Sequence, residues 1–365
     1  MSEPRLMEGN EALAEAAIRA GCRGYFGYPI TPQSEVLEYL AGEGRKRGMV
    51  VLQVESELAA INMVYGAAGA GARAMTSSSS PGISLMQEGI SYIACAELPC
   101  LVVNVNRGGP GLGTIQPSQG DYFQATKGGG HGDYHLIVLA PASVQEMADF
   151  VYDGFDLADK YRNPVMILAD GALGQMMEKV VFKDYDPKAH EPAKPWATTG
   201  KTPDRARNIL TSLHIQPEKM EEINLRLQAK YARISREEVR FEQMYTDDAE
   251  ILVVAYGLMA RISHRAVEMA RIRGVKVGLL RPITLWPYPY RVLEELAPRL
   301  KGVLVVEMNA GQMVEDVRLG INGKVPVEFF GRMGGMIPSP DDIVGKILAM
   351  TTHAPKPVEE EAHAR

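Results

Sequence analysis

The feature that most constrains the fold is a series of short apolar runs that barely alternate with polar residues and are separated by helical segments. In the first half of the chain the runs lie at 23–26, 50–54, 74–76, 100–105, 136–139 and 165–168. Strands alternate when one face meets water, whereas strands buried on both faces do not. The pattern therefore predicts a doubly wound α/β domain with a parallel sheet over residues 1–183.

The second half of the chain repeats this rhythm after an interruption. Residues 184–248 break it, because Pro-rich text leads into a stretch at 218–243 that is dense in Glu, Lys and Arg. We interpret 184–248 as a linker and a charged, exposed helix that packs on a neighbouring domain or subunit. A second, smaller α/β domain is predicted over 249–351. Its strands are expected at 251–255, 277–280, 303–306 and 325–329. The tail, 352–365, is expected to be flexible.

Two helix starts carry clear capping signals. Ser143 and Glu146 have the spacing of a capping box at the start of a helix predicted over 143–160. Ser339 precedes Pro340 as an N-cap precedes a first-turn proline, which predicts the last helix of the chain.

The first loop at the carboxyl end of a predicted strand runs from Gly27 to Pro32. Ligands of open α/β sheets bind at such loops. Thr31 is expected to be an N-cap with Pro32 in the first helical position, a role worth about 1 kcal/mol by itself. The same geometry offers free amide donors and the positive end of a helix dipole, which suit a carboxylate or phosphate. Thr31 can serve both purposes.

A second loop leads into an Ala/Gly-rich helix that begins near Ser56 and carries Glu57 in its first turn. An acidic residue at that place is favourable for the helix dipole alone. The small residues that follow suit a helix buried on most sides. In that case Glu55 or Glu57 would be desolvated with a raised pKa, as acid–base catalysis near neutral pH requires.

A third loop places Arg107 beside the glycines of Gly108–Gly113. Such an arginine can hold a ligand carboxylate through two parallel hydrogen bonds, or it can form a salt bridge that fixes the loop. The turn Ser77–Ser80 can cradle an anion but lacks the P-loop pattern, and no GxGxxG follows a strand, which disfavours a nicotinamide enzyme.

Composition excludes several classes of function. Lys and Arg number 39 against 45 Asp and Glu, a net charge of -6, so the chain lacks a basic footprint for nucleic acid. Cys22, Cys95 and Cys100 are too few and too scattered for a zinc ion or an iron–sulfur cluster, so we expect no metal site on this chain. With no export signal and no apolar stretch near about 20 residues, a cytoplasmic protein that does not span the membrane is expected.

Several motifs together resemble the alpha-type subunit of 2-oxoacid:ferredoxin oxidoreductases. They are YPITP at 28–32, the stretch from ESELAAINMVYGAAGAGA to SYIA at 55–94, and NRGGPG at 106–111. The likeness continues in LRPITLWPYP at 280–289 and EMNAGQM at 307–313, which are similar to a transketolase carboxyl-terminal type of domain. Within the family, the chain looks most like the members that act on 3-methyl-2-oxobutanoate.

The resemblance implies a thiamine diphosphate enzyme whose cofactor lies between two chains, with the first domain of the pyrimidine-binding type. It implies that Glu57 is catalytic and hydrogen-bonds a ring nitrogen of the aminopyrimidine, which stabilises the imino tautomer that activates the thiazolium carbon. The other implied cofactor-binding residues are Tyr28, Pro29 and Ile30. The implied substrate-binding residues are Thr31, Arg107, which would hold the 2-oxoacid carboxylate, and Thr114.

The same resemblance implies several partners. A diphosphate-binding beta-type subunit would hold the diphosphate and its magnesium, because no GDG motif with a following Asn stands here in a suitable setting. Gamma-type and ferredoxin-like subunits would carry iron–sulfur clusters, coenzyme A would accept the acyl group, and ferredoxin would accept the electrons. The implied reaction is the oxidative decarboxylation of a 2-oxoacid to an acyl-CoA.

One departure from the family bears on the substrate. Relatives of the 2-oxoglutarate type tend to read RGGPSTGLPT where this chain reads RGGPGLGTIQ, so Gln116 replaces a threonine and only Thr114 lies close. This favours a branched aliphatic substrate, although a methylene is worth only about 1–3 kcal/mol in discrimination. The alternatives are the same chemistry on 2-oxoglutarate or an aromatic 2-oxoacid, and a non-catalytic scaffold subunit.

Overall fold

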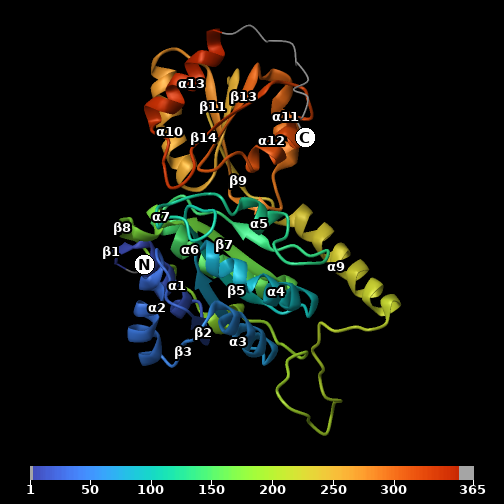
Figure 1. The fold of residues 1–365 in the computed structure, drawn as a ribbon. Coiled ribbons are helices and arrows are strands. Elements are labelled where there is room, and N and C mark those ends of the chain that lie inside the picture. The colour runs from blue at the N-terminus through green and yellow to red at the C-terminus, as the bar shows by residue number, and fades with distance from the viewer. Residues whose placement is uncertain (1–2, 353–365) are drawn as a thin grey trace.

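The first domain is built on a seven-stranded sheet, seen in the computed structural model, which describes residues 3–352 (Figure 1). The strand order is β12-β6-β7-β5-β4-β2-β3, and every pairing is parallel except that of β12 with β6. The strands are β2 (Gly24–Gly27), β3 (Val50–Gln53), β4 (Ala74–Ser78), β5 (Cys100–Asn106), β6 (Ile137–Leu139), β7 (Pro164–Asp170) and β12 (Thr284–Trp286). The predicted parallel sheet is confirmed, and β4, β5 and β7 are buried along their whole length.

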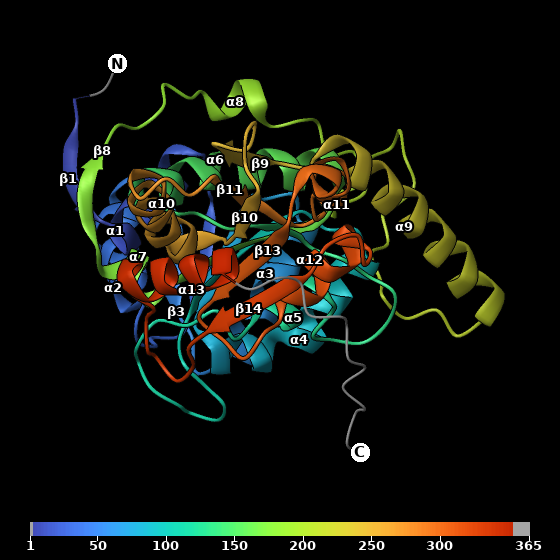
Figure 2. The same cartoon turned by 90° about the horizontal axis from the view of Figure 1, so that it is seen from above.

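Helices cover both faces of this sheet. On one side α1 packs on α6, and on the other α3 packs on α4 (Figure 2). The helices of this domain are α1 (Gly9–Arg19), α2 (Ser34–Tyr39), α3 (Glu57–Gly69), α4 (Ser80–Cys95), α5 (Tyr122–Thr126), α6 (Val144–Tyr161) and α7 (Gly171–Gln175). A π-helical turn, Leu40–Gly44, extends α2, and β1 (Arg5–Glu8) pairs with β8 (Met177–Val180) as a separate ribbon.

The helices predicted to begin after Ser143 and Ser339 both do so. Only the capping box at Ser143 differs in detail from the prediction. At α6 the Ser143 hydroxyl accepts a hydrogen bond from the Glu146 amide at 3.1 Å, while the Glu146 carboxylate accepts one from the amide of Ala142, one residue before the cap. At α13 (Pro340–Thr352) the Ser339 hydroxyl accepts from the Asp342 amide at 3.2 Å, as predicted.

The prediction that Thr31 is an N-cap is wrong. Helix α2 begins at Ser34 and its N-cap residue is Gln33. The Gln33 amide donates to the carbonyl of Ile30 at 3.0 Å, so Thr31 and Pro32 form a turn ahead of the helix, and their peptide bond is cis.

The second domain has a five-stranded sheet in the order β14-β13-β10-β11-β9, parallel except for β9. Its strands are β9 (Phe241–Met244), β10 (Ile251–Val254), β11 (Val277–Pro282), β13 (Gly302–Glu307) and β14 (Val327–Gly331). Its helices are α10 (Gly257–Ile272), α11 (Tyr290–Leu296), α12 (Met313–Ile321) and α13, with a 3-10 turn at Ala297–Arg299. Strand β9 comes from the segment 184–248, which therefore contributes to this sheet as well as to the connection.

The connecting segment also carries α8 (Pro187–His190) and α9 (Pro217–Glu237). Helix α9 exposes most of its charged residues and buries a stripe consisting of Ile223, Leu227, Tyr231 and Ile234. The Tyr231 ring packs edge-on against His135 of the first domain and Trp286 of β12. Helix α9 is therefore fixed along the first domain, where Figure 1 shows it extending to one side. Of the tail predicted at 352–365, residue 352 ends α13 and the rest lies outside the described residues.

The carboxyl ends of the two sheets face each other across the domain interface. Gln119, which follows β5, exchanges hydrogen bonds with Met308 after β13 and donates its amide to the carbonyl of Tyr256 after β10. The Tyr122 hydroxyl donates to Asp316 of α12 at 2.6 Å. These contacts lie over β5, β6 and β7, so one half of the first sheet's carboxyl edge is covered by the second domain.

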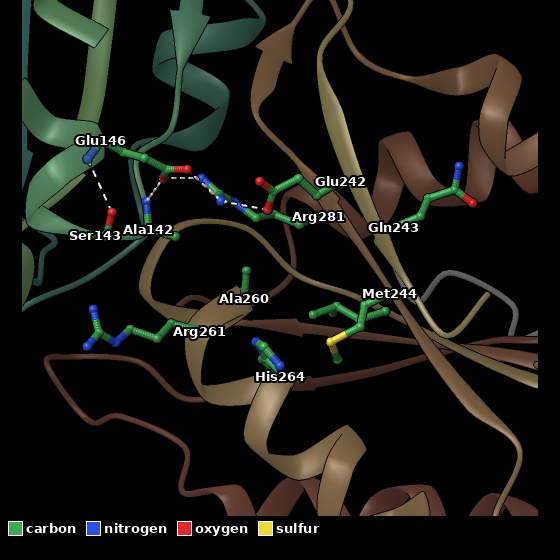
Figure 3. A pocket seen from close by; sticks show the side chains of 11 residues that line it. Ala142, Ser143, Glu146, Glu242, Gln243, Met244, Ala260, Arg261, His264 and Arg281 are labelled. Carbon is green, nitrogen blue, oxygen red and sulfur yellow. Dashed lines mark hydrogen bonds and ion pairs between the residues drawn. The ribbon is translucent and has the colours of Figure 1, made fainter. Parts of the chain in front are cut away.

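A cavity of ≈ 400 Å³ lies between the domains beside this interface (Figure 3). Arg281 of β11 reaches across it and donates to Glu146 of α6 and to Glu242 of β9, at 2.9 Å each. Glu146 thus serves the start of α6 and the contact between the domains, because its Oε2 accepts from both the Ala142 amide and Arg281 while its Oε1 accepts from Arg281 alone.

Candidate active site

The uncovered half of the carboxyl edge, formed by β2, β3, β4 and the start of the loop after β5, holds the predicted catalytic carboxyl. Glu57 is the first residue of α3 and is 5% exposed. Ser56 caps this helix by accepting from the Ala59 amide at 3.3 Å, which orients the first turn. The Ser78 hydroxyl donates to Glu57 Oε1 at 3.5 Å. No lysine, arginine or histidine within residues 3–352 forms an ion pair with Glu57, and Glu55 points to solvent.

Gly82 makes the room that this carboxyl occupies. A Cβ built on Gly82 would lie less than 3.0 Å from both Ser78 Oγ and Glu57 Oε1, closer than real Cβ atoms come. Gly82 lies in the first turn of α4, so the absence of a side chain there is what allows Glu57 to lie against that helix. The sequence analysis singled out the neighbouring turn Ser77–Ser80 as a place for an anion and did not connect Gly82 with Glu57.

Arg107 lies close to Thr31 in the same half of the edge. Its Nη1 donates to the carbonyl of Thr31 at 3.0 Å, and its amide donates to the hydroxyl of Ser80 at 3.1 Å. No carboxylate of the described chain lies within 4.0 Å of the Arg107 guanidinium, so the salt-bridge alternative is not what holds this loop. The positive charge of Arg107 is left without a counter-charge.

Several buried polar atoms at the strand ends and loops of this edge have no hydrogen-bond partner. Such atoms are uncommon in folded proteins, because each costs about 1–3 kcal/mol. Those at this edge are Gln33 Nε2, Ser79 Oγ, Asn104 Oδ1, Asn106 Nδ2 and Arg107 Nε. Their concentration indicates a place where a ligand or ordered water completes the hydrogen bonding.

Two residues of this region, the buried Gln33 and the half-buried Asp121, were missed by sequence reasoning. Gln33 accepts a hydrogen bond from Ser77 at 2.6 Å, and Ser77 is joined to the Tyr25 hydroxyl at 2.8 Å, so the base of the loop at 28–32 is fixed to β2 and β4. Asp121 accepts from the Asn104 amide at 2.8 Å. Burial raises the pKa of Asp121, against the lowering effect of hydrogen bonds from Ser80 and Asn104. No local sequence pattern marks either residue, because each is defined by its contact with a strand distant in sequence.

The remaining predicted residues lie at the open surface of the edge. Tyr28, Pro29 and Thr31 are exposed and Ile30 is half-buried. Thr114 donates its amide to Gly108 at 2.8 Å and accepts at its hydroxyl from Gln116, so it stabilises the Arg107 loop from within. No hydrogen bond among the described residues joins Thr114 to Glu57 or to Arg107.

The expectation that α3 is buried on most sides is wrong for the single chain. Leu58 is 47% exposed and Met63 is 36% exposed, because no residue between 3 and 352 covers them on the helix face opposite α4 and the sheet. Glu57 is buried nonetheless, since it faces Ser78 and Gly82. Of the two carboxyls of which one was expected to be desolvated, Glu55 is exposed and Glu57 is buried.

The chain matches two family models in succession. One, described as pyruvate flavodoxin/ferredoxin oxidoreductase, thiamine diphosphate-binding, covers residues 15–245, and the other, pyruvate:ferredoxin oxidoreductase core domain II, covers residues 249–343. The ketoisovalerate oxidoreductase subunit VorB of Methanothermobacter thermautotrophicus is 51% identical over 343 residues, which are 94% of this chain and 97% of the relative. This chain belongs to the 2-oxoacid:ferredoxin oxidoreductase family.

Other relatives place the chain among the alpha-type subunits of these multi-subunit oxidoreductases. The 2-oxoglutarate synthase subunit KorA of Methanothermobacter marburgensis is 39% identical, over 96% of this chain and 100% of the relative. A solved 2-oxoglutarate:ferredoxin oxidoreductase from Magnetococcus marinus superposes with a TM-score of 0.83 at 29% identity. The oxidoreductase subunit described here covers 65% of the length of that solved chain and is itself covered to 96%.

A split-gene transketolase, with a TM-score of 0.59 at 14% identity, shares the fold of this oxidoreductase subunit. It confirms the transketolase-like arrangement of the two domains. Within residues 3–352, no three His, Cys, Asp or Glu side chains gather closely enough to hold a metal ion. Over the same residues, each helix is too short or too polar to cross a bilayer.

Proposed function

We propose that this chain is the pyrimidine-binding alpha-type subunit of a thiamine diphosphate-dependent oxidoreductase that converts 3-methyl-2-oxobutanoate to its acyl-CoA and passes the electrons to ferredoxin. The observation that carries the proposal is a buried carboxyl, Glu57, at an open sheet edge that also presents the unpaired cation Arg107. The 51% identity to ketoisovalerate oxidoreductase subunits supports the branched-chain substrate.

The residues of the open edge fit the aminopyrimidine of thiamine diphosphate. Glu57 is buried, and its only hydrogen bond within the described chain is the long one from Ser78, so it is free to hold a ring nitrogen. Tyr28, Pro29 and Ile30 provide the adjoining wall, and the partnerless atoms of this edge provide polar anchors. When bound, thiamine diphosphate supplies a nucleophilic carbon for the 2-oxoacid carbonyl and accepts the electrons of the broken bond.

In this proposal each residue of the chain has a defined task. Glu57 holds a proton at the pyrimidine nitrogen, and burial keeps water from competing for that hydrogen bond. Arg107 binds the carboxylate of the 2-oxoacid through its planar guanidinium, because that group forms no ion pair with any carboxylate among the described residues. Thr31 and Thr114, on either side of Arg107, are proposed to border the substrate.

The open edge also supports a shared site. Exposed apolar side chains gather where the Arg107 loop meets the loop after β14, since Gly335 lies against Gln116. They are Leu112, Ile115, Met333 and Met336. Contiguous exposed apolar side chains are typical of subunit interfaces. We propose that a beta-type subunit docks here and holds the diphosphate and its magnesium, while gamma-type and ferredoxin-like subunits carry the iron–sulfur clusters.

The test is reconstitution of the complex from this chain and its partners, with four 2-oxoacids compared by kcat/KM. Activity is expected only when a diphosphate-binding partner is present, with 3-methyl-2-oxobutanoate preferred over pyruvate, 2-oxoglutarate and phenylglyoxylate. The identity of 38–39% to 2-oxoglutarate synthase subunits makes 2-oxoglutarate the second candidate. A higher kcat/KM for 2-oxoglutarate would overturn the substrate assignment. Tight, magnesium-dependent binding of thiamine diphosphate by this chain alone would overturn the shared site.

A further inference from the structure

A cavity of ≈ 530 Å³ lies at the opposite end of the first domain from the candidate active site. Its walls are the end of α4, the turn at Glu97 before β5, the turn at Arg162 before β7, and the linker and α9. Those turns precede β5 and β7, so the cavity is at the amino ends of the strands, whereas Glu57 and Arg107 are at the carboxyl end. It belongs to neither the active site nor the domain interface.

The charges around this cavity do not balance. The lining has three cations, which are Arg162, Lys219 and Arg226, and one carboxylate, which is Glu97. Glu97 is already engaged, because it accepts from Arg226 at 2.8 Å and from Lys230 at 3.3 Å. Lys219 pairs with the exposed Glu222 at 2.6 Å. The lining therefore carries a surplus of positive charge.

Arg162 is the lining cation that forms no ion pair among the described residues, because the carboxylate of nearby Glu97 is paired with Arg226 and Lys230. Its Nε donates to the backbone carbonyl of Glu97 at 3.1 Å, and its guanidinium lies 4.6 Å from the ring centroid of Trp196. No described residue supplies an acceptor for its two terminal amino groups. Burial lowers the pKa of Arg162, and burial lowers the pKa of nearby Lys230 to about 8, with Arg162 and Arg226 adding to the effect on Lys230; Glu97 opposes both shifts without cancelling them. An anion would relieve this repulsion.

Besides the charged groups and the polar Asn208, Thr211 and His214, the cavity has an apolar wall. Leu210 and Ile209 from the linker and Ile223 from α9 line it beside Trp196. An inorganic ion would leave these side chains against water, whereas a molecule with an anionic group and an apolar body would cover them. We propose that this cavity binds a small organic anion, with its carboxylate or phosphate on the guanidinium of Arg162 and its body against Ile223 and Leu210.

The reactivity of the Cys95 thiol can report whether the cavity is occupied. Cys95 lines the cavity and is partly exposed, whereas Cys22 and Cys100 are buried and serve as internal references. Burial raises the pKa of the Cys95 thiol, so alkylation is measured at mildly alkaline pH. The purified full-length chain is treated with iodoacetamide, and each cysteine is followed by mass spectrometry. This readout needs no catalysis, so its failure is distinct from failure of the proposed reaction.

The probes are phenyl phosphate and hexanoate, with phenol and hexanol as neutral counterparts at equal ionic strength. At ten times the dissociation constant of the effective anion, alkylation of Cys95 should slow about tenfold, and the neutral molecules should have no comparable effect. Protection by either anion would support the proposed site. Protection by neither anion, or equal protection by the neutral molecules, would overturn the proposal.

Substitutions of single arginines test whether the protection of Cys95 depends on an anion bound at Arg162. Arg162→Gln should abolish the protection, and Arg162→Lys should keep part of it, because the charge stays while the planar fork is lost. Arg226→Gln, at the exposed side of the cavity, is a second variant in case Arg162→Gln fails to fold. The matched control is Arg233→Gln, which removes a cation from α9 away from the lining. Protection that persists in Arg162→Gln and Arg226→Gln would refute an anion site.

Discussion

At the scale of single residues, the candidate site depends on Glu57, whose carboxylate has few partners among the described residues. One long hydrogen bond from Ser78 and the space left by Gly82 keep a carboxyl buried without a cation beside it. The sequence pointed to Glu57 and Arg107 because each follows a predicted strand at the binding edge. It could not point to Gln33 or Asp121, since their roles depend on contacts with β4 and β5 that no local pattern encodes.

The first prediction concerns Glu57. Glu57→Gln keeps the shape of the side chain but removes the group that holds the proton, so kcat of the assembled complex should fall about 10²-fold or more, the usual range for acid–base groups. Glu55→Gln, on the exposed neighbour, is the control and should leave kcat unchanged. Normal turnover of Glu57→Gln at saturating thiamine diphosphate would refute the assigned role.

The second prediction concerns Gly82. In Gly82→Ala the new methyl group would displace Ser78 or Glu57, so activity should fall and the free energy of unfolding should drop by about 1–3 kcal/mol. Gly66 lies in α3 where an added methyl group would meet no atom within 4 Å beyond the backbone of its own helix. Gly66→Ala should therefore be neutral or stabilise by up to about 1 kcal/mol. Denaturant unfolding and steady-state rates of both variants give the comparison, and equal behaviour would contradict it.

The third prediction concerns the pH dependence of stability at Asp170. Burial raises the pKa of Asp170 from 3.8 to about 6, although three backbone amides oppose the shift. The folded chain thus binds more protons than the unfolded chain between these pH values, so its stability falls as pH rises through that window. Asp170→Asn does not titrate. Its free energy of unfolding relative to wild type should rise by roughly 3 kcal/mol from below pH 4 to above pH 6. A difference that stays constant with pH would contradict the shift.

At the scale of elements, the apolar runs predicted the buried parallel strands well, because burial on both faces leaves a strong local signal. The short antiparallel strands were missed. Strand β12 pairs with β6, which lies far away in sequence, and β9 lies at the edge of the second sheet with exposed residues. Such strands form because a distant strand pairs with them, so their own residues carry little sequence signal. The N-cap predicted at Thr31 failed for a similar reason, since the turn at 30–33 depends on its surroundings.

The fourth prediction concerns Trp286 of β12, whose ring stacks on His135 at 4.4 Å between centroids and meets Tyr231 of α9 edge-on. Trp286→Ala should lower the free energy of unfolding by about 3 kcal/mol. Amides of α9 should also exchange faster with solvent, because the helix loses its contact with β12. Leu225→Ala, on the exposed face of α9, is the control for hydrogen exchange and should change little. Unchanged exchange in Trp286→Ala would mean that α9 is held by other contacts.

At the scale of the whole molecule, the second domain covers the carboxyl edge over β5, β6 and β7 and leaves β2, β3 and β4 uncovered. The sequence predicted two α/β domains, but it could not predict this placement. The placement depends on Gln119, Tyr122 and Arg281 meeting residues more than 100 positions away.

The fifth prediction tests the docking of a partner. Leu112 is 80% exposed at the tip of the Arg107 loop. Leu112→Ser should leave the stability of this chain unchanged but weaken its affinity for the diphosphate-binding subunit, about tenfold for the roughly 1.5 kcal/mol that one leucine contributes. Ile272→Ser, at the far end of α10, is the control. Analytical ultracentrifugation of the mixtures measures both, and equal affinity of the Leu112 variant and wild type would exclude this loop from the interface.

The half-covered edge also has a consequence for how such a chain evolves. Residues at the carboxyl ends of β5 to β7 contact residues encoded by the same gene. A harmful substitution there can therefore be compensated within one polypeptide. Under the proposed assembly, residues at the carboxyl ends of β2 to β4 contact a subunit that is encoded by a second gene. Compensating substitutions for Leu112 or Leu58 should therefore be sought in the neighbouring subunit, and the two genes should be inherited together.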